Sequence, residues 1–223
     1  MIVALDFQTL DEALDMAMKT QAEVAGFKVG LELMTAVGPR AITAIADLGL
    51  PVFADLKLHD IPNTVERASG RVSAAGARWV TVHAAGGTAM MQAAVSGMGE
   101  SGVLAVTVLT SLSADDLAAT GMSMGPPGPV HRLAALAVAA GVEGIVCSPT
   151  DVASVRELVG GRLIFSPGIR LPDAGHDDQK RVATPVAAVG AGADYLVIGR
   201  TITSSVDPAT TAREIAVSLA AFD

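Results

Sequence analysis

The chain has 223 residues, of which 51% are hydrophobic and only 17% are charged, and its mean hydropathy is +0.49. A chain of this size and composition can bury a large core, which excludes an intrinsically disordered protein. The formal net charge of −8 and the 3% of aromatic residues argue against nucleic acid as a partner, because that role uses basic patches and aromatic stacking surfaces.

The apolar stretches are too short to cross a membrane. The longest covers residues 133–142, whereas a membrane-spanning helix needs roughly 20 apolar residues. The start of the chain reaches Asp6 without any basic stretch, so we expect no signal peptide. Cys147 is the single cysteine, which excludes an internal disulfide and suits a reducing compartment. We therefore expect a cytoplasmic protein with no membrane partner.

Short hydrophobic runs alternate with helix-like stretches along the whole chain. We predict eight strands, at Ile2–Asp6, Gly26–Gly30, Val52–Lys57, Trp79–His83, Val103–Val108, Gly144–Cys147, Leu163–Ser166 and Tyr195–Gly199. Helical spacing predicts helices between them, such as Leu10–Lys19 and His131–Ala140, and a last helix at Asp207–Ala221. This alternation predicts one α/β domain over residues 1–223, a (β/α)8 TIM barrel. An open doubly wound sheet would need a glycine-rich turn after the first strand, and none follows Asp6.

Ionisable residues gather at the ends of the first three predicted strands. Barrel enzymes place their chemistry at the carboxyl ends of strands, and here those ends carry Asp6, Lys28, and the pair Asp55 and Lys57. Lys28 stands between two hydrophobic residues and is expected to point the opposite way, into the barrel mouth. Asp55 and Lys57 are two residues apart and so share a face of their strand. Asp60 follows on the loop.

An alternating row of acids and lysines in an apolar shell favours catalysis over stability. Buried ion pairs barely repay their desolvation, although a salt-bridge network that closes the barrel is the structural alternative. A lysine between carboxylates stays protonated, so it is a poor Schiff-base nucleophile. Lys57 is instead suited to act as a general acid, or as a fixed cation that faces a developing carbanion.

The last two predicted strands end in motifs typical of phosphate binding. Ser166-Pro167-Gly168-Ile169-Arg170 follows the seventh strand and Ile198-Gly199-Arg200 ends the eighth. Barrels commonly bind phosphate in these loops, where glycine lets backbone N–H groups approach and arginine offers two parallel donors. The alternative is that the glycines only form turns and the arginines are solvated.

The four histidines are scattered, without the spacing of metal ligands. We expect His83 to support its neighbours through hydrogen bonds. His59 should point away from the face of Asp55 and Lys57 and serve a structural role. The sequence also lacks the glycine-flanked nucleophile of a Ser–His–Asp enzyme. No metal site is predicted.

Several longer motifs identify a family. They are Ala4-Leu5-Asp6, Phe27-Lys28-Val29-Gly30, Asp55-Leu56-Lys57-Leu58-His59-Asp60-Ile61-Pro62-Asn63-Thr64, Val106-Thr107-Val108-Leu109-Thr110-Ser111, Pro167-Gly168-Ile169-Arg170, Asp178-Gln179-Lys180-Arg181 and Tyr195-Leu196-Val197-Ile198-Gly199-Arg200. With them the chain resembles the orotidine 5′-monophosphate decarboxylase family over essentially its whole length, most closely the bacterial type. The resemblance implies a barrel of the ribulose-phosphate-binding type.

The resemblance also implies an activity and roles for the charged residues. The activity is decarboxylation of orotidine 5′-monophosphate to uridine 5′-monophosphate, the last step of de novo pyrimidine synthesis, without metal or organic cofactor. Lys57 would stabilise the carbanion at C6 and protonate it, beside Asp55. Lys28 would hold Asp55 and contact the ribose, and Asp6 would bind the ribose hydroxyls.

The remaining implied roles concern the partner subunit and the two ends of the substrate. Asp60 and Thr64 resemble residues that reach the neighbouring site of an obligate homodimer. Thr110 and, after a looser match, Ser113 would read the pyrimidine. The residues implied to grip the phosphate are Arg170, Gln179, Gly199 and Arg200, and residues 171–178 resemble its flexible lid.

Two rival functions remain open at this point. One is a Mg²⁺-dependent decarboxylase of a keto-sugar phosphate, or a hexulose phosphate synthase, which share the Asp-x-Lys-x-x-Asp pattern but have a carboxylate at the position of Lys28. The other is a catalytically inactive barrel that binds nucleotides, which retention of Lys57 and both carboxylates disfavours.

Overall fold

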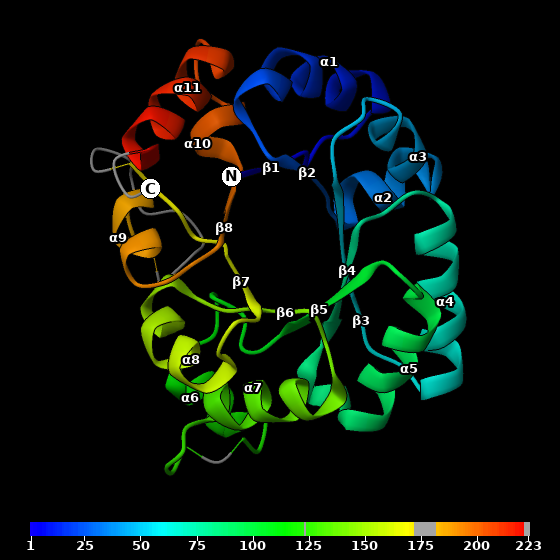
Figure 1. Ribbon diagram of the computed structural model, residues 1–223, viewed down its shortest axis with the longest axis vertical. Helices are drawn as coiled ribbons and strands as arrows, with labels where there is room; N and C mark the ends of the chain where they lie inside the picture. Colours follow the sequence, from blue (N-terminus) through cyan, green and yellow to red (C-terminus); the bar gives the residue numbers. More distant parts are fainter. Residues whose placement is uncertain (123, 172–181, 221–223) are drawn as a thin grey trace.

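The computed structural model describes residues 1–122, 124–171 and 182–220. Eight parallel strands form a closed barrel in chain order, and helices surround it on the outside (Figure 1). The strands are β1 (Ile2–Ala4), β2 (Gly26–Val29), β3 (Val52–Leu58), β4 (Trp79–His83), β5 (Gly102–Val106), β6 (Gly144–Val146), β7 (Leu163–Ser166) and β8 (Tyr195–Ile198). The predicted (β/α)8 barrel is confirmed.

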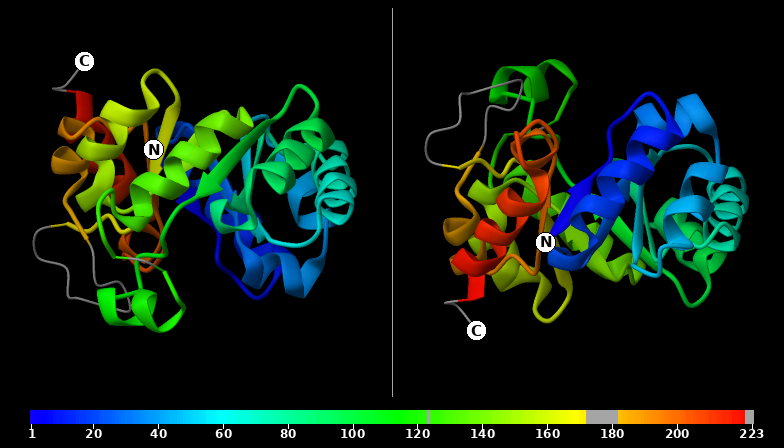
Figure 2. Two further views of the ribbon diagram at one scale, coloured as in Figure 1. Left: turned by 90° about the horizontal axis from the view of Figure 1, so that it is seen from below. Right: turned by 90° about the horizontal axis from the view of Figure 1, so that it is seen from above.

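The helical layer contains both long helices and short turns. The helices are α1 (Leu10–Thr20), α2 (Leu31–Val37), α3 (Arg40–Ala46), α4 (Pro62–Ala74), α5 (Thr88–Met98), α6 (Ala114–Ala119), α7 (Pro129–Ala140), α8 (Val152–Val159), α9 (Pro185–Gly190), α10 (Arg200–Thr203) and α11 (Pro208–Leu219). Figure 2 shows α6, in green, projecting beyond one end of the barrel. Within the described ranges, no helix has the length and hydropathy needed to cross a membrane.

The predicted elements agree with the observed ones except at their ends. The strands at Trp79–His83 and Leu163–Ser166 have the predicted bounds. The first and fifth strands were expected to reach Asp6 and Val108, but β1 ends at Ala4 and β5 ends at Val106. The last helix begins one residue later than predicted because Asp207 caps it, accepting a hydrogen bond from the N–H of Thr210. Capping residues satisfy free N–H groups at a helix start but lie outside the helix itself.

The core consists of two layers separated by the strands. The larger layer lies between strands and helices, and the smaller one fills the barrel interior. We call four residues of the interior layer the aromatic floor: Phe53, Trp79, Phe165 and Tyr195. Their ring centroids are 4.5–5.4 Å apart in the contacting pairs. In the described part of the chain, this packed floor fills the barrel interior at the end opposite to the carboxyl ends of the strands.

Candidate active site

A cavity of about 540 Å³ opens at the carboxyl ends of the strands. Its volume is in the range of sites that hold small ligands. The wall brings together two groups of residues that the sequence predicted separately. One side carries Asp6, Lys28, Asp55 and Lys57, and the other carries the residues after β7 and β8.

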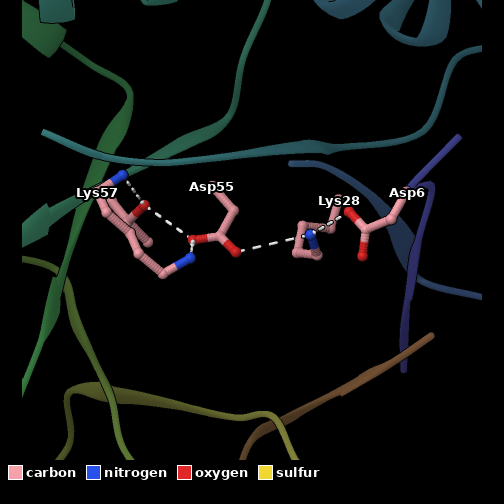
Figure 3. Close-up of polar contacts among 5 residues, drawn as sticks. Asp6, Lys28, Asp55 and Lys57 are labelled. Carbon is pink, nitrogen blue, oxygen red and sulfur yellow. Dashed lines mark hydrogen bonds and ion pairs between the residues drawn. The ribbon is translucent and has the colours of Figure 1, made fainter. Parts of the chain in front are cut away.

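Four charges of alternating sign form the first side of the cavity, and we call them the charged row: Asp6, Lys28, Asp55 and Lys57 (Figure 3). The Nζ of Lys28 lies 2.8 Å from Oδ1 of Asp6 and 3.6 Å from Oδ2 of Asp55. The Nζ of Lys57 lies 2.8 Å from Oδ1 of Asp55. The side chain of Lys28 is 10% exposed and that of Lys57 is 28% exposed. Lys57 is therefore the lysine that is more open to a ligand.

The environment of Asp55 keeps its carboxylate charged. Burial by itself would raise the pKa of Asp55. The positive charges of Lys28 and Lys57, together with hydrogen bonds from Lys57 and Thr81, outweigh burial and lower this pKa below its usual value. A permanent negative charge is thus fixed next to the ammonium of Lys57.

The backbone of β3 leaves regular strand geometry at Lys57. Lys57 has φ of 51°, the only non-glycine residue of the described ranges with a positive φ, and such a conformation costs about 1–2 kcal/mol. The pairing with β4 shifts between Ala54 and Leu58. Asp55 and Lys57 were predicted to share a face of their strand, and their side chains do meet in an ion pair. The regular alternation on which that prediction rested does not hold at Lys57. Strain of this kind is typical of functional sites.

Two residues of this region were not predicted to matter. Thr81 of β4 donates a hydrogen bond to Oδ1 of Asp55, at 3.0 Å, and accepts one from the N–H of Lys57, at 2.9 Å. A methyl group added to Gly30 would lie 2.4 Å from Oδ1 of Asp6 and 2.5 Å from Nζ of Lys28. Gly30 therefore leaves the space in which Asp6 and Lys28 meet. A threonine in a hydrophobic strand was the available sequence signal for Thr81.

The second side of the cavity contains most of the residues predicted to bind phosphate and base. Gly168, Arg170, Gly199, Arg200 and Thr110 all line it. The guanidinium of Arg170 also donates to the carbonyl of Ile169, at 2.9 Å. Gln179 and residues 172–178 of the lid predicted at 171–178 lie outside the described residues.

Three predicted residues lie away from the cavity wall. Asp60 and Thr64 are exposed, before and within the first turn of α4, and the carboxylate of Asp60 accepts a hydrogen bond from the N–H of Ile61. The Ser113 hydroxyl caps helix α6 and pairs with Asp116. The capping geometry holds Ser113 outside the lining of this cavity, in the wall of a neighbouring one.

The two histidines near the charged row form a pair. The ring centroids of His59 and His83 are 5.7 Å apart. The pKa of His83 is lowered by burial and by the charges of His59 and Lys57, while Asp55 opposes this shift. The lowered pKa favours the neutral form of His83, and its role as a hydrogen-bonding support stays a prediction. The ring of His83 lies against that of His59, which is exposed and is not part of the cavity wall.

The chain is similar to known proteins along nearly its full length. Residues 1–215 match the orotidine 5′-phosphate decarboxylase / HUMPS family. A protein of Anaeromyxobacter sp. (strain K), called orotidine 5′-phosphate decarboxylase, is 56% identical over 97% of this chain and 96% of its own length. A protein of the same name from Sphingopyxis alaskensis is 47% identical over 97% of each chain.

Solved structures agree with these sequence matches. The crystal structure of orotidine 5′-phosphate decarboxylase from Lactobacillus acidophilus superimposes with a TM-score of 0.83 at 33% identity and covers 96% of both chains. An uncharacterized conserved protein from Geobacillus kaustophilus superimposes with a TM-score of 0.82 at 34% identity. On the family match and on these identities, the chain belongs to the orotidine 5′-phosphate decarboxylase / HUMPS family.

Proposed function

We propose that this protein decarboxylates orotidine 5′-monophosphate to uridine 5′-monophosphate, the last step of de novo pyrimidine synthesis. The observation that carries the proposal is the pairing of Lys57 with Asp55 in the wall of the cavity. A carboxylate whose pKa is lowered stands beside a lysine whose backbone is held in a strained conformation. The identity of the substrate is inferred from the relatives that are called orotidine 5′-phosphate decarboxylase.

Decarboxylation leaves an electron pair on the carbon that loses carbon dioxide. In the proposed reaction the bond between C6 and the carboxylate breaks, carbon dioxide departs, and the electron pair stays on C6. The ammonium of Lys57 stabilises this carbanion and transfers one proton to C6, after which the neutral lysine regains a proton from water. A fixed cation next to developing negative charge lowers the barrier because it needs no reorganisation. Asp55 holds the Lys57 ammonium in place through the ion pair at 2.8 Å.

The other residues of the cavity bind the parts of the substrate that do not react. Asp6 and Lys28 are placed to contact the ribose, and Thr110 the pyrimidine, whereas Arg170, Gly199 and Arg200 hold the phosphate together with Gln179. Ser113 would contact the pyrimidine only after a rearrangement of the segment that follows β5, because its hydroxyl caps α6 outside the cavity wall. Binding energy from the phosphate can then support chemistry at the distant ring.

We also propose a homodimer in which Asp60 and Thr64 complete the site of the partner subunit. Asp60 and Thr64 are exposed and lie outside the cavity of their own chain. Ile61 between them is 65% exposed, and a large apolar side chain beside functional polar residues suits an interface. The cytoplasm is the expected location, where pyrimidine synthesis takes place.

The charged row disfavours the Mg²⁺-dependent alternatives. A divalent cation would need the space between carboxylates. The Nζ of Lys28 stands between Asp6 and Asp55, within 2.8 Å and 3.6 Å of their oxygens. A second positive charge there would be repelled. The row therefore supports chemistry that uses the protein's own cations.

The proposal is tested by product analysis with EDTA-treated wild-type protein. Orotidine 5′-monophosphate should disappear, as followed by its absorbance, while uridine 5′-monophosphate and carbon dioxide form in equal amounts. Two results would contradict the proposal. One is no turnover by folded protein, as an inactive barrel would behave. The other is turnover that EDTA abolishes and Mg²⁺ restores, above all with a keto-sugar phosphate as substrate.

A further inference from the structure

Thr81 is buried beneath the charged row, out of reach of any substrate. It is the middle residue of β4 and is 0% exposed. Alternation along β4 turns Thr81 to the barrel interior on the side of Trp79, whereas Val80 and Val82 pack in the outer layer. Thr81 therefore lies above the aromatic floor and directly below the reacting groups.

The single hydroxyl of Thr81 connects two parts of β3. A carboxylate only accepts hydrogen bonds and a backbone amide only donates them. The Thr81 hydroxyl must therefore donate its hydrogen to Asp55, at 3.0 Å, and accept from the N–H of Lys57, at 2.9 Å. Both roles are fixed, so the hydroxyl cannot rotate away without losing one partner.

This connection coincides with the irregular part of β3. Ala54 pairs with Val80 and Leu58 pairs with Val82, so β3 has more residues than β4 over the same stretch. Lys57 takes up the extra length in the left-handed conformation, with φ of 51°. Its N–H donates to the hydroxyl of the Thr81 side chain. A buried amide without an acceptor would be costly, so Thr81 stabilises this backbone.

We infer that Thr81 is a positioning residue for the proposed decarboxylation: its hydroxyl fixes the backbone of Lys57 and the carboxylate of Asp55 in one geometry. The inference rests on the proposed function and deepens it, because it names what holds the proton donor in place. Misplacement of a reacting group by about 1 Å can reduce a rate roughly 10²-fold. Substrate binding at the phosphate end does not depend on Thr81.

The test compares three variants with the wild type in steady-state kinetics on orotidine 5′-monophosphate. Thr81→Val removes the hydroxyl and keeps the shape, Thr81→Ser keeps the hydroxyl, and Thr107→Val is the matched control. Thr107 is also buried, and its hydroxyl donates only to the carbonyl of Val146, at 3.1 Å. Both Thr81→Val and Thr107→Val remove one buried hydroxyl, so an effect seen only in Thr81→Val comes from the contacts of Thr81 and not from the loss of a buried hydroxyl in general.

For Thr81→Val we expect kcat to fall by about 10- to 100-fold while KM stays within about threefold, because the lost contact affects the reacting groups and not ground-state binding. Thr81→Ser should recover most of kcat, and Thr107→Val should retain it. If Thr81→Val does not yield folded protein, Thr81→Ala carries the same expectation. Wild-type kcat in the folded Val or Ala variant, a change in KM alone, or no recovery with serine would overturn the inference.

A failure of the inference is distinguishable from a failure of the proposed function. Wild-type protein without turnover would refute the proposed function alone. A crystal structure of Thr81→Val would still test the positioning role, because Lys57 should then leave the left-handed conformation. An unchanged φ at Lys57 in that structure would overturn the inference whatever the substrate is.

Discussion

The ammonium of Lys57 lies 2.8 Å from Oδ1 of Asp55, and the same oxygen accepts a hydrogen bond from the hydroxyl of Thr81. Oδ1 of Asp55 thus accepts hydrogen bonds from a charged ammonium and from a neutral hydroxyl, while Oδ2 of Asp55 faces the ammonium of Lys28. Figure 3 shows how these contacts run on to Asp6. Within the row, Lys28 is held between Asp6 and Asp55, and Lys57 is held by Asp55.

Stability at acid pH should depend on Asp55. Its folded-state pKa is lowered, so at a given acid pH the unfolded chain binds more protons at this residue. Its contribution to stability is therefore complete above the ordinary carboxyl pKa of about 4 and is lost as the pH falls through the lower folded-state value. Denaturant unfolding at pH 6 and at about pH 3 should show a smaller loss of stability in Asp55→Asn than in the wild type.

The matched control is Asp15→Asn, because Asp15 pairs with Lys19 on the exposed surface of α1. Exposed pairs of this kind contribute little to stability, so this variant should keep the pH dependence of the wild type. An Asp55→Asn variant that loses as much stability as the wild type over the same interval would contradict the expected role of Asp55.

Substitution of Gly30 should separate the two ions at the end of the charged row. The added methyl of Gly30→Ala would lie 2.4 Å from Asp6 and 2.5 Å from Lys28, which is closer than atoms can approach. We expect kcat/KM for orotidine 5′-monophosphate to fall about 10²-fold, since small displacements of binding groups are costly. Gly161→Ala, at a position with open space around it, should retain activity. Equal kinetics of the two variants would refute this role of Gly30.

Removal of Arg200 should weaken the distinction between substrates with and without phosphate. In the wild type, orotidine should be a far poorer substrate than its 5′-phosphate. In Arg200→Ala the ratio of the two kcat/KM values should shrink by about 10- to 100-fold, as expected for loss of a charge-assisted pair worth about 1.5–3 kcal/mol. Arg40→Ala on α3 is the control, because Arg40 is exposed and lies outside the cavity wall. A ratio unchanged in Arg200→Ala would show that Arg200 does not hold the phosphate.

Mixed subunits should regain activity if Asp60 acts across a dimer interface. Lys57→Ala and Asp60→Ala chains should each be inactive or nearly so. In a hybrid dimer one site would combine the native Lys57 of one chain with the native Asp60 of the other. With random exchange of subunits in a twofold dimer, about a quarter of the wild-type activity should return. Lack of recovery, with subunit exchange verified by two different affinity tags, would refute the shared site.

Most of the barrel could be predicted because its strands are uninterrupted hydrophobic runs. Such runs mark strands that are buried on both faces, and their carboxyl ends then determine which charged residues meet. Lys28, Asp55 and Lys57 were found in this way, and the structure places them within ion-pair distance.

The strained backbone of Lys57 could not be predicted from its neighbours in sequence. No glycine marks the position, and the conformation depends on the register with β4 and on the hydroxyl of Thr81. The placement of Ser113 could have been found, however. Ser113 and Asp116 have the spacing of a helix capping box, which predicts a hydroxyl engaged in capping.

The most direct test of the central claim is the activity of Lys57→Ala on orotidine 5′-monophosphate, measured in the presence of EDTA. Lys19→Ala, at an exposed lysine of α1, is the control for loss of a positive charge. We predict wild-type turnover by the control and a loss of about 10⁴-fold or more in kcat/KM for Lys57→Ala, because one residue supplies both the stabilising cation and the proton. A folded Lys57→Ala protein that decarboxylates the substrate within about tenfold of the wild-type rate would contradict the account.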